Sequence, residues 1–280
     1  MPNTALPASS PFVRIKAGSE RPPIFIAHGV CGTVQFFRLA KHIHTDNPVY
    51  GIQARGIDDA EKPFDRVEDM GAFYLDALQQ THGEGPYILV GYSFGGLVAL
   101  EMAQCLLKAG KEVALLVLVD TYPHPRFLAA DQRRRLFLKR LRNHLSQVQR
   151  LPLPDALEYV FRGIQKRFKF VSSSESFTGD LEATPRGTAL ERVKQSAYLA
   201  FQRYQPAYYP GKVKLVTAEV KTFFPDDPAA VWGKLVRELE VEVVPGDHLS
   251  IVNKDFEPLA AVITRYVREL KTATAYELSR

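Results

Sequence analysis

The strongest chemical signal in the sequence is a serine with a glycine two positions away on either side, Gly91-Tyr92-Ser93-Phe94-Gly95. An apolar run precedes this segment and a helical pattern follows it. A serine on a sharp strand-to-helix turn adopts strained backbone angles, and side chains at the flanking positions would collide, so glycine is needed there. The N-terminus of the helix also faces any negative charge that forms beside the serine. The pattern therefore predicts that Ser93 is a nucleophile.

A serine hydroxyl needs a base to take its proton and a third group to orient that base. Where a serine lies on such a turn, the acid and then the histidine follow it in the chain. His248 follows the last predicted strand and is favoured over His28, which precedes Ser93. The other histidines lie in polar surroundings and are interpreted as solvated: His42, His44, His82, His124 and His144.

Asp120 is a candidate for the acid because it directly follows an apolar run, and loops at the carboxyl ends of parallel strands converge. The rival carboxylates follow the next predicted strand: Glu219, Asp226 and Asp227. Order alone does not choose between Asp120 and Asp226. Asp247 is adjacent to His248 in the chain, where side chains usually diverge.

Acyl transfer also requires hydrogen-bond donors for the developing oxyanion. These are usually the amide after the nucleophile and an amide from an early strand-to-helix loop, which correspond to Phe94 and Val30. Cys31 has no strand-turn-helix elbow and is interpreted as a packed thiol. The sequence contains no Gly-x-Gly-x-x-Gly, Walker loop or His-Glu-x-x-His, so we expect neither a nucleotide cofactor nor a metal.

Short apolar runs that alternate with helical patterns must position these residues. Strands are predicted at 12–16, 24–27, 49–53, 87–92, 113–119, 213–218 and 241–244, and helices at 34–44, 67–80, 94–108, 229–238 and 256–270. This alternation predicts an α/β fold with a mostly parallel central sheet flanked by helices. It is interrupted between residues 122 and 205, where helical periodicity continues without a convincing strand. We expect a core formed by 1–121 and 206–280, with 122–205 inserted as a helical lid.

The composition excludes several classes of protein. With 46% hydrophobic and 24% charged residues among 280, the chain is neither disordered nor a coiled coil. The longest apolar run, 113–119, is far shorter than the roughly 18 residues that a membrane-spanning helix requires, so no stable membrane association is expected. Two cysteines and the lack of a secretory signal pattern favour a cytoplasmic protein.

The ordered set of motifs resembles the α/β-hydrolase thioesterases of polyketide and nonribosomal peptide synthesis. The similarity runs from about residue 22 to 266 outside much of the predicted lid. Its markers are 22–29, 85–96, the strand ending in Asp120, 209–213, Trp232 in a helix, and 245–248. Within the family, Gly-Tyr-Ser-Phe-Gly-Gly is more similar to terminal, product-releasing domains than to free-standing ones.

This resemblance implies an α/β-hydrolase fold with Asp120 as the acid, the amides of Val30 and Phe94 as oxyanion donors, and a helical lid after the acid. It implies a thioesterase that releases an acyl, polyketide or peptidyl chain from a phosphopantetheine arm through a Ser93–His248–Asp120 triad. The release is by hydrolysis or cyclisation. The partner would be an acyl or peptidyl carrier protein that binds transiently, with no further cofactor.

The net charge of +5 is unevenly distributed. Residues 122–205 contain 16 lysines and arginines against 7 acidic residues, whereas the rest of the chain contains 20 against 24. Charge runs usually only face water. The sharper hypothesis is that Arg134, Arg135 and Arg140 attract an acidic carrier protein or the phosphate of its arm. Nucleic acid is not expected, because aromatic residues do not interleave the basic run.

Two other functions share these features. A carboxylesterase or lipase acting on oxygen esters would use the same catalytic residues, and only a comparison of substrates separates it from a thioesterase. A non-catalytic binding module with the same fold is a different class, against which the presence of Ser93, Asp120 and His248 argues.

Overall fold

The structure, a computed structural model, describes residues 10–27, 29, 36–58, 61–83, 85–152, 188–222 and 224–278. The chain forms two compact units. The first comprises Met1–Leu128, Ala189–Lys221 and Pro225–Arg280, and the second comprises Ala129–Thr188 and Thr222–Phe224. Ser93, Asp120 and His248 all belong to the first unit.

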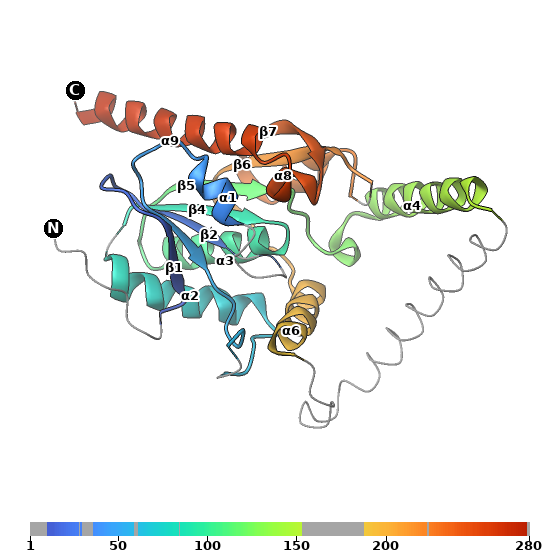
Figure 1. The fold of residues 1–280 in the computed structure, drawn as a ribbon, viewed down its shortest axis with the longest axis horizontal. Coiled ribbons are helices and arrows are strands. Elements are labelled where there is room, and N and C mark those ends of the chain that lie inside the picture. The colour runs from blue at the N-terminus through green and yellow to red at the C-terminus, as the bar shows by residue number, and fades with distance from the viewer. Residues whose placement is uncertain are drawn as a thin grey trace. The chain divides into compact units, whose positions relative to one another are not determined.

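In the described part of the chain, seven strands form one sheet in the order β1-β3-β2-β4-β5-β6-β7 (Figure 1). β1 pairs antiparallel with β3, and all other neighbours are parallel. The predicted mostly parallel sheet is therefore confirmed. The strands are β1 (Phe12–Lys16), β2 (Ile24–Ala27), β3 (Val49–Ile52), β4 (Tyr87–Tyr92), β5 (Val113–Val119), β6 (Tyr209–Val220) and β7 (Val236–Asp247).

Helices cover both faces of this sheet. On one face lie α1 (Phe36–Lys41), α8 (Ser250–Asn253) and α9 (Glu257–Leu278), and on the other lie α2 (Val67–His82) and α3 (Phe94–Lys108) (Figure 1). The first unit also contains the 3₁₀ turn η1 (Pro125–Phe127), α6 (Ala189–Arg203) and α7 (Pro228–Trp232). The two-sided cover explains why the central strands are apolar on both faces.

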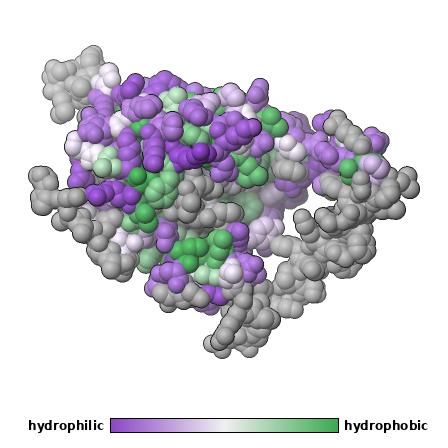
Figure 2. Space-filling view, viewed as in Figure 1, coloured by the Kyte–Doolittle hydropathy of each residue, from purple (hydrophilic) through white to green (hydrophobic). Residues whose placement is uncertain are grey.

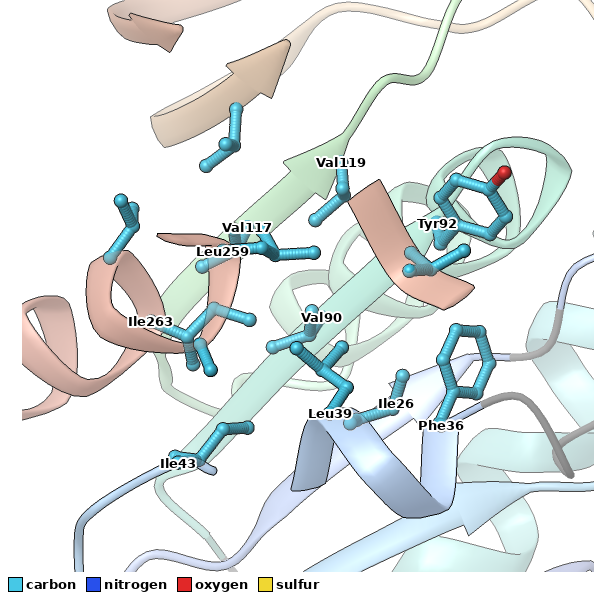
Figure 3. Close-up of a cluster of buried hydrophobic side chains, with 14 of the residues drawn as sticks. Ile26, Phe36, Leu39, Ile43, Val90, Tyr92, Val117, Val119, Leu259 and Ile263 are labelled. Atoms are coloured by element: carbon cyan, nitrogen blue, oxygen red, sulfur yellow. The ribbon is translucent and has the colours of Figure 1, made fainter. Parts of the chain in front are cut away.

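The core on the α9 face is formed by aliphatic side chains that alternate along the strands. Ile26, Val90 and Val117 come from β2, β4 and β5, and they face Leu39 of α1 and Ile263 of α9 (Figure 3). All five are buried. Because successive strand residues point to opposite faces, every second residue of β4 belongs to this cluster. Tyr92, the last residue of β4, is on this face too.

The C-terminal helix α9 is amphipathic. Its inner side buries Leu259 and Ile263, while the surface over it is largely hydrophilic (Figure 2). At the boundary, the Lys214 ammonium lies 2.9 Å from Glu269 of α9 and 3.0 Å from Glu240 of β7. These ion pairs link the helix to the last two strands.

Two hydrogen bonds join helix α3 to the segment that directly follows α6. The Tyr204 hydroxyl, directly after α6, donates to Glu101 Oε2 of α3 at 2.7 Å. Gln104, one turn further along α3, donates to the carbonyl of Ala207 at 2.9 Å. A buried carboxylate is costly unless it is hydrogen-bonded, so the Glu101–Tyr204 contact fixes where the chain enters β6.

The helical prediction for 229–238 is wrong beyond residue 232. α7 ends there, and the chain is already in β7 at Val236, which pairs with Tyr209 of β6. Over only a few positions, the charged and apolar residues after Trp232 are compatible with either a helix or a strand. Pairing with β6 makes this segment a strand. Strands β6 and β7 are consequently longer than the predicted 213–218 and 241–244.

The second unit contains α4 (Ala130–Arg150), which lies inside the segment 122–205 predicted as a lid. Within this unit the ammonium of Lys139 donates to the carbonyl of Phe224 at 3.1 Å, and Asn143 donates to the carbonyl of Thr222 at 3.0 Å. Leu136 is buried, whereas four apolar side chains of the same helix are exposed: Phe137, Leu138, Leu141 and Leu145.

Candidate active site

Ser93 lies between β4 and α3 with a left-handed φ of 55°. Its amide donates to the carbonyl of Val119 at 2.8 Å, which ties the turn to the end of β5. A Cβ added at Gly91 would lie 2.3 Å from the carbonyl oxygen of Gly95, so the close approach requires glycine at position 91, as the motif predicted. The strained serine is held because the strand and the helix on either side are buried.

Gly96 has a second packing constraint that sequence reasoning did not identify. A Cβ at this position would lie 1.9 Å from Oγ1 of Thr121, the residue after Asp120. The carbonyl of Thr121 in turn accepts a hydrogen bond from Trp232 Nε1 at 2.9 Å. The first turn of α3 is thus packed directly on the loop that carries Asp120.

Asp120 lies at the carboxyl end of β5 and is 1% exposed. Its φ is 43°, and among the described residues it shares a left-handed φ with only one other non-glycine residue, Ser93. Its amide donates to the carbonyl of Val216 at 2.7 Å, and its Oδ1 accepts from the amide of Ala218 at 3.3 Å. Its Oδ2 is 2.6 Å from Nδ1 of His248.

His248 lies in the loop between β7 and α8, with 24% of its side chain exposed. Because a carboxylate only accepts hydrogen bonds, contact with Asp120 places a proton on Nδ1, and in the neutral imidazole the lone pair is then on Nε2. The imidazole is therefore oriented to accept a proton at Nε2. The Tyr92 ring stacks on this imidazole, a contact that sequence reasoning missed because nothing in the motif specifies the side chain before the serine.

Asp247 does not compete for the imidazole. Its Oδ1 accepts from the amides of Leu249 and Ser250 at 2.9 Å each, and its own amide donates to Ser250 Oγ at 2.9 Å. The backbone hydrogen bonds lower the pKa of the Asp247 carboxyl. This carboxylate therefore accepts hydrogen bonds at the start of α8 and holds the loop that contains His248.

The rival acids lie elsewhere. Asp227 accepts from the amide of Ala230 at 2.9 Å and caps α7, and Glu219 is exposed. Asp226 is close enough to Tyr122 to act on it electrostatically: burial, then Asp120, then Asp226 raise the pKa of that phenol. The contact with His248 Nδ1 is made by Asp120, which favours Asp120 where chain order left two candidates.

Other predicted site residues are only partly covered by the structure. Phe94 begins α3 and is buried, so its amide belongs to the first turn after Ser93. Val30, His28 and Cys31 lie outside the described residues. The described side chains include no group of three or more His, Cys, Asp or Glu arranged to hold a metal.

His82 shows the clearest difference from the prediction that these histidines are solvated. His82, expected to be solvated, is half-buried between aromatic rings, with Phe25 and Tyr50 both at 4.8 Å between ring centroids. Burial, reinforced by Arg21, lowers its pKa to about 4. It lies beside β1, β2 and β3 and contributes to packing there.

The site lies at the carboxyl edge of a parallel sheet. The chain passes from β2 to β3 on one side and then to β4 on the other, so β2 and β4 flank the point where strand order reverses. Crevices for ligands form outside the carboxyl ends of strands at such a point. Ser93, Asp120 and His248 follow β4, β5 and β7 and all lie at this edge. In the described ranges, no helix has both the length and the hydropathy needed to cross a membrane.

Comparison with known proteins identifies the family of this chain. The family model for the thioesterase domain matches residues 22–267. Malpinin synthetase of Mortierella alpina is 42% identical over 120 residues, which are 42% of this chain and 2% of that protein. The chain thus spans a small fraction of the length of this curated relative.

Solved structures show the same fold. A crystal structure of holo-AB3403, a four-domain nonribosomal peptide synthetase, matches with a TM-score of 0.64 at 20% identity over 93% of this chain and 20% of that chain. The NocB thioesterase domain, in covalent complex with a fluorophosphonate nocardicin G analogue, matches with a TM-score of 0.59 at 22% identity over 89% of this chain and 95% of that one.

The family model covers most of the chain, and the predicted α/β-hydrolase fold is confirmed by these structures. Such a family implies a hydrolase that acts on thioesters. The resemblance inferred from the motifs is confirmed, and the chain belongs to the thioesterase domain family.

Proposed function

We propose that this chain releases an acyl, polyketide or peptidyl group from the phosphopantetheine arm of a carrier protein through an acyl-Ser93 intermediate. The observation that carries the proposal is the 2.6 Å contact between His248 Nδ1 and Asp120 Oδ2 at the same sheet edge as the strained Ser93. Membership of the thioesterase family supports the thioester as the bond that is broken.

In the first half of the reaction, His248 Nε2 takes the hydroxyl proton of Ser93 as Oγ attacks the thioester carbonyl. Asp120 stabilises the imidazolium, and the amides of Phe94 and Val30 donate to the oxyanion. The C–S bond then breaks, the leaving thiolate takes the proton from His248, and the acyl group remains on Ser93.

In the second half, a nucleophile releases the acyl group. Water gives hydrolysis, and a hydroxyl or amine of the substrate itself gives cyclisation. In both cases His248 takes the proton of the attacking group and returns it to Ser93 Oγ.

The partner in this proposal is a carrier protein that docks on α4, which lies within the segment 122–205 that we propose as a lid. On α4, Arg134 and Arg135 are exposed and Arg140 is partly exposed. The helix contains seven basic residues and one acidic residue, and exposed apolar side chains accompany them. A surface of this kind suits an acidic, phosphate-bearing partner.

We also propose a reducing, cytoplasmic location, which the low number of cysteines in the sequence favours.

The decisive experiment is intact mass spectrometry after incubation with candidate acyl-carrier thioesters and with the matching oxygen esters. We expect an acyl adduct that maps to Ser93 with the thioester and is absent in Ser93→Ala. Normal turnover of acyl thioesters by Ser93→Ala would overturn the mechanism. Faster turnover of the oxygen esters would indicate an esterase, and the absence of any Ser93 adduct with a fluorophosphonate would indicate a binding module.

A further inference from the structure

Tyr92 precedes Ser93 in the chain, but its side chain contacts His248. The two rings are stacked, with centroids 4.9 Å apart and planes inclined by 26°. The Tyr92 hydroxyl donates to the backbone carbonyl of His248 at 2.5 Å. One side chain therefore contacts both the ring and the main chain of the same histidine, across 156 residues of sequence.

The position of Tyr92 is itself fixed by the core side chains around it. It is 5% exposed, and the ring of Phe36 meets it edge-on with centroids 6.2 Å apart. Figure 3 shows Tyr92 at the end of β4, with its hydroxyl directed away from Val90 and Ile26. Because its backbone lies in a buried strand that ends in the nucleophile turn, the ring has little freedom to move relative to Ser93.

Tyr92 acts on a part of His248 that two other contacts do not reach. Asp120 contacts Nδ1 at the edge of the imidazole, and the Asp247–Ser250 hydrogen bonds hold the loop backbone. The stacked tyrosine covers one face of the imidazole and so opposes a tilt of the ring toward that side.

We propose that Tyr92 is a positioning residue that aligns His248 with Ser93 and stabilises the imidazolium formed when the base takes the serine proton. The inference rests on the proposed function, in which His248 is the base. An aromatic face attracts a cation, and the attraction is larger where the pair is shielded from water. Because the charge exists only after proton transfer, the stacking favours the transition state over the ground state.

The test separates the ring from the hydroxyl and uses a matched control. Tyr92→Phe keeps the stacked ring and loses the hydrogen bond to His248, whereas Tyr92→Leu loses both. Tyr74→Phe is the control, because Tyr74 is also a buried tyrosine whose hydroxyl donates to a backbone carbonyl, that of Gln53, at 3.3 Å. The readouts are kcat and KM with an acyl thioester, the rate of fluorophosphonate labelling at Ser93, and Tm.

We expect Tyr92→Phe to lower kcat by about 5-fold, the size of one lost hydrogen bond. Tyr92→Leu should lower kcat by about 30-fold or more, as the ring contact is lost as well. KM should stay within about 2-fold, because substrate binding is not altered. The rate of labelling by the fluorophosphonate, which forms an O–P bond at Ser93 and releases fluoride and the hydroxyl proton, should fall in parallel with kcat.

A purely structural role predicts a different pattern. If Tyr92→Phe and Tyr92→Leu lowered Tm but labelled Ser93 as fast as Tyr74→Phe does, the positioning role would be refuted while the proposed function stood. If the unaltered protein formed no adduct at Ser93, the proposed function itself would fail. A fall in labelling confined to the Tyr92 variants, at temperatures below every Tm, would support the inference.

Discussion

Helices α3 and α4 are neighbouring α-helices along the chain, but the fraction of their residues that is buried differs greatly. In α3, which begins directly after Ser93, 12 of 15 residues are buried, including the polar Glu101 and Gln104. In α4, Leu136 is the one buried residue among the 20 whose side chains the structure describes, and four large apolar side chains are exposed. Helix α3 is thus packed in the core of its unit, whereas most side chains of α4 are exposed.

Under the proposed function, this difference corresponds to two tasks of the chain. A nucleophile, acid and base must keep their relative positions within a fraction of an ångström, and close packing with backbone hydrogen bonds holds such positions. The carboxylate of Asp120 and the turn at Ser93 are fixed by backbone hydrogen bonds that end in β5 and β6. In the proposed function, a surface that binds a transient carrier protein needs exposed charge and apolar area instead, and α4 has both.

The largest expected effect concerns the acid. Asp120→Asn should lower kcat by about 10⁴-fold, because an amide facing Nδ1 stabilises the wrong tautomer of His248. The matched control is Asp247→Asn on the other side of the same histidine. Its remaining oxygen still accepts from the amides of Leu249 and Ser250, so activity should stay within about 5-fold. Steady-state kinetics with an acyl thioester measure both. Equal losses in the two variants would remove the distinction between the two carboxylates.

A matched pair of leucines tests the contrast between the helices directly. Leu100 of α3 is fully buried, and Leu141 of α4 is 44% exposed. Leu100→Ala should lower the free energy of unfolding by about 2–5 kcal/mol, and Leu141→Ala by less than about 0.5 kcal/mol. Urea unfolding followed by circular dichroism gives both values, and the fluorescence of Trp232, the one tryptophan in the sequence, follows the first unit alone. A large loss for Leu141→Ala would mean that the apolar face of α4 is covered in the folded protein.

The parts of the fold that the sequence predicts well are those with strong local patterns. The strands 24–27, 87–92 and 113–119 and helix 94–108 have the predicted bounds, because each combines continuous apolar residues with a clear turn at its end. The end of α7 and the start of β7 were not predictable, since strand pairing between β6 and β7 determines them. Pairing across more than 20 residues leaves no local signal.

The candidate site shows the same limit. Chain order and motif spacing place Ser93, Asp120 and His248 at one sheet edge, and the choice between Asp120 and Asp226 needed a family resemblance or a distance. The contacts that fix these residues were not predictable. The need for glycine at 96 depends on Thr121, and the role of Tyr92 depends on a histidine 156 positions away.

The smallest expected effect concerns the exposed helix. Arg134→Glu and Arg140→Glu should each weaken binding of a purified phosphopantetheine-bearing carrier protein by about 10-fold at low salt, as charge reversal turns attraction into repulsion. The difference should shrink at about 0.5 M salt, where screening is strong.

Lys234→Glu in the first unit is the control for net charge, because Lys234 is exposed and lies outside α4. Binding is measured by titration calorimetry, and turnover of a small acyl thioester without a carrier should be unchanged in all three variants. Equal affinity of the carrier for Arg134→Glu, Lys234→Glu and the unaltered protein would show that α4 is only a solvated surface. The two tasks would then not be divided between the two helices.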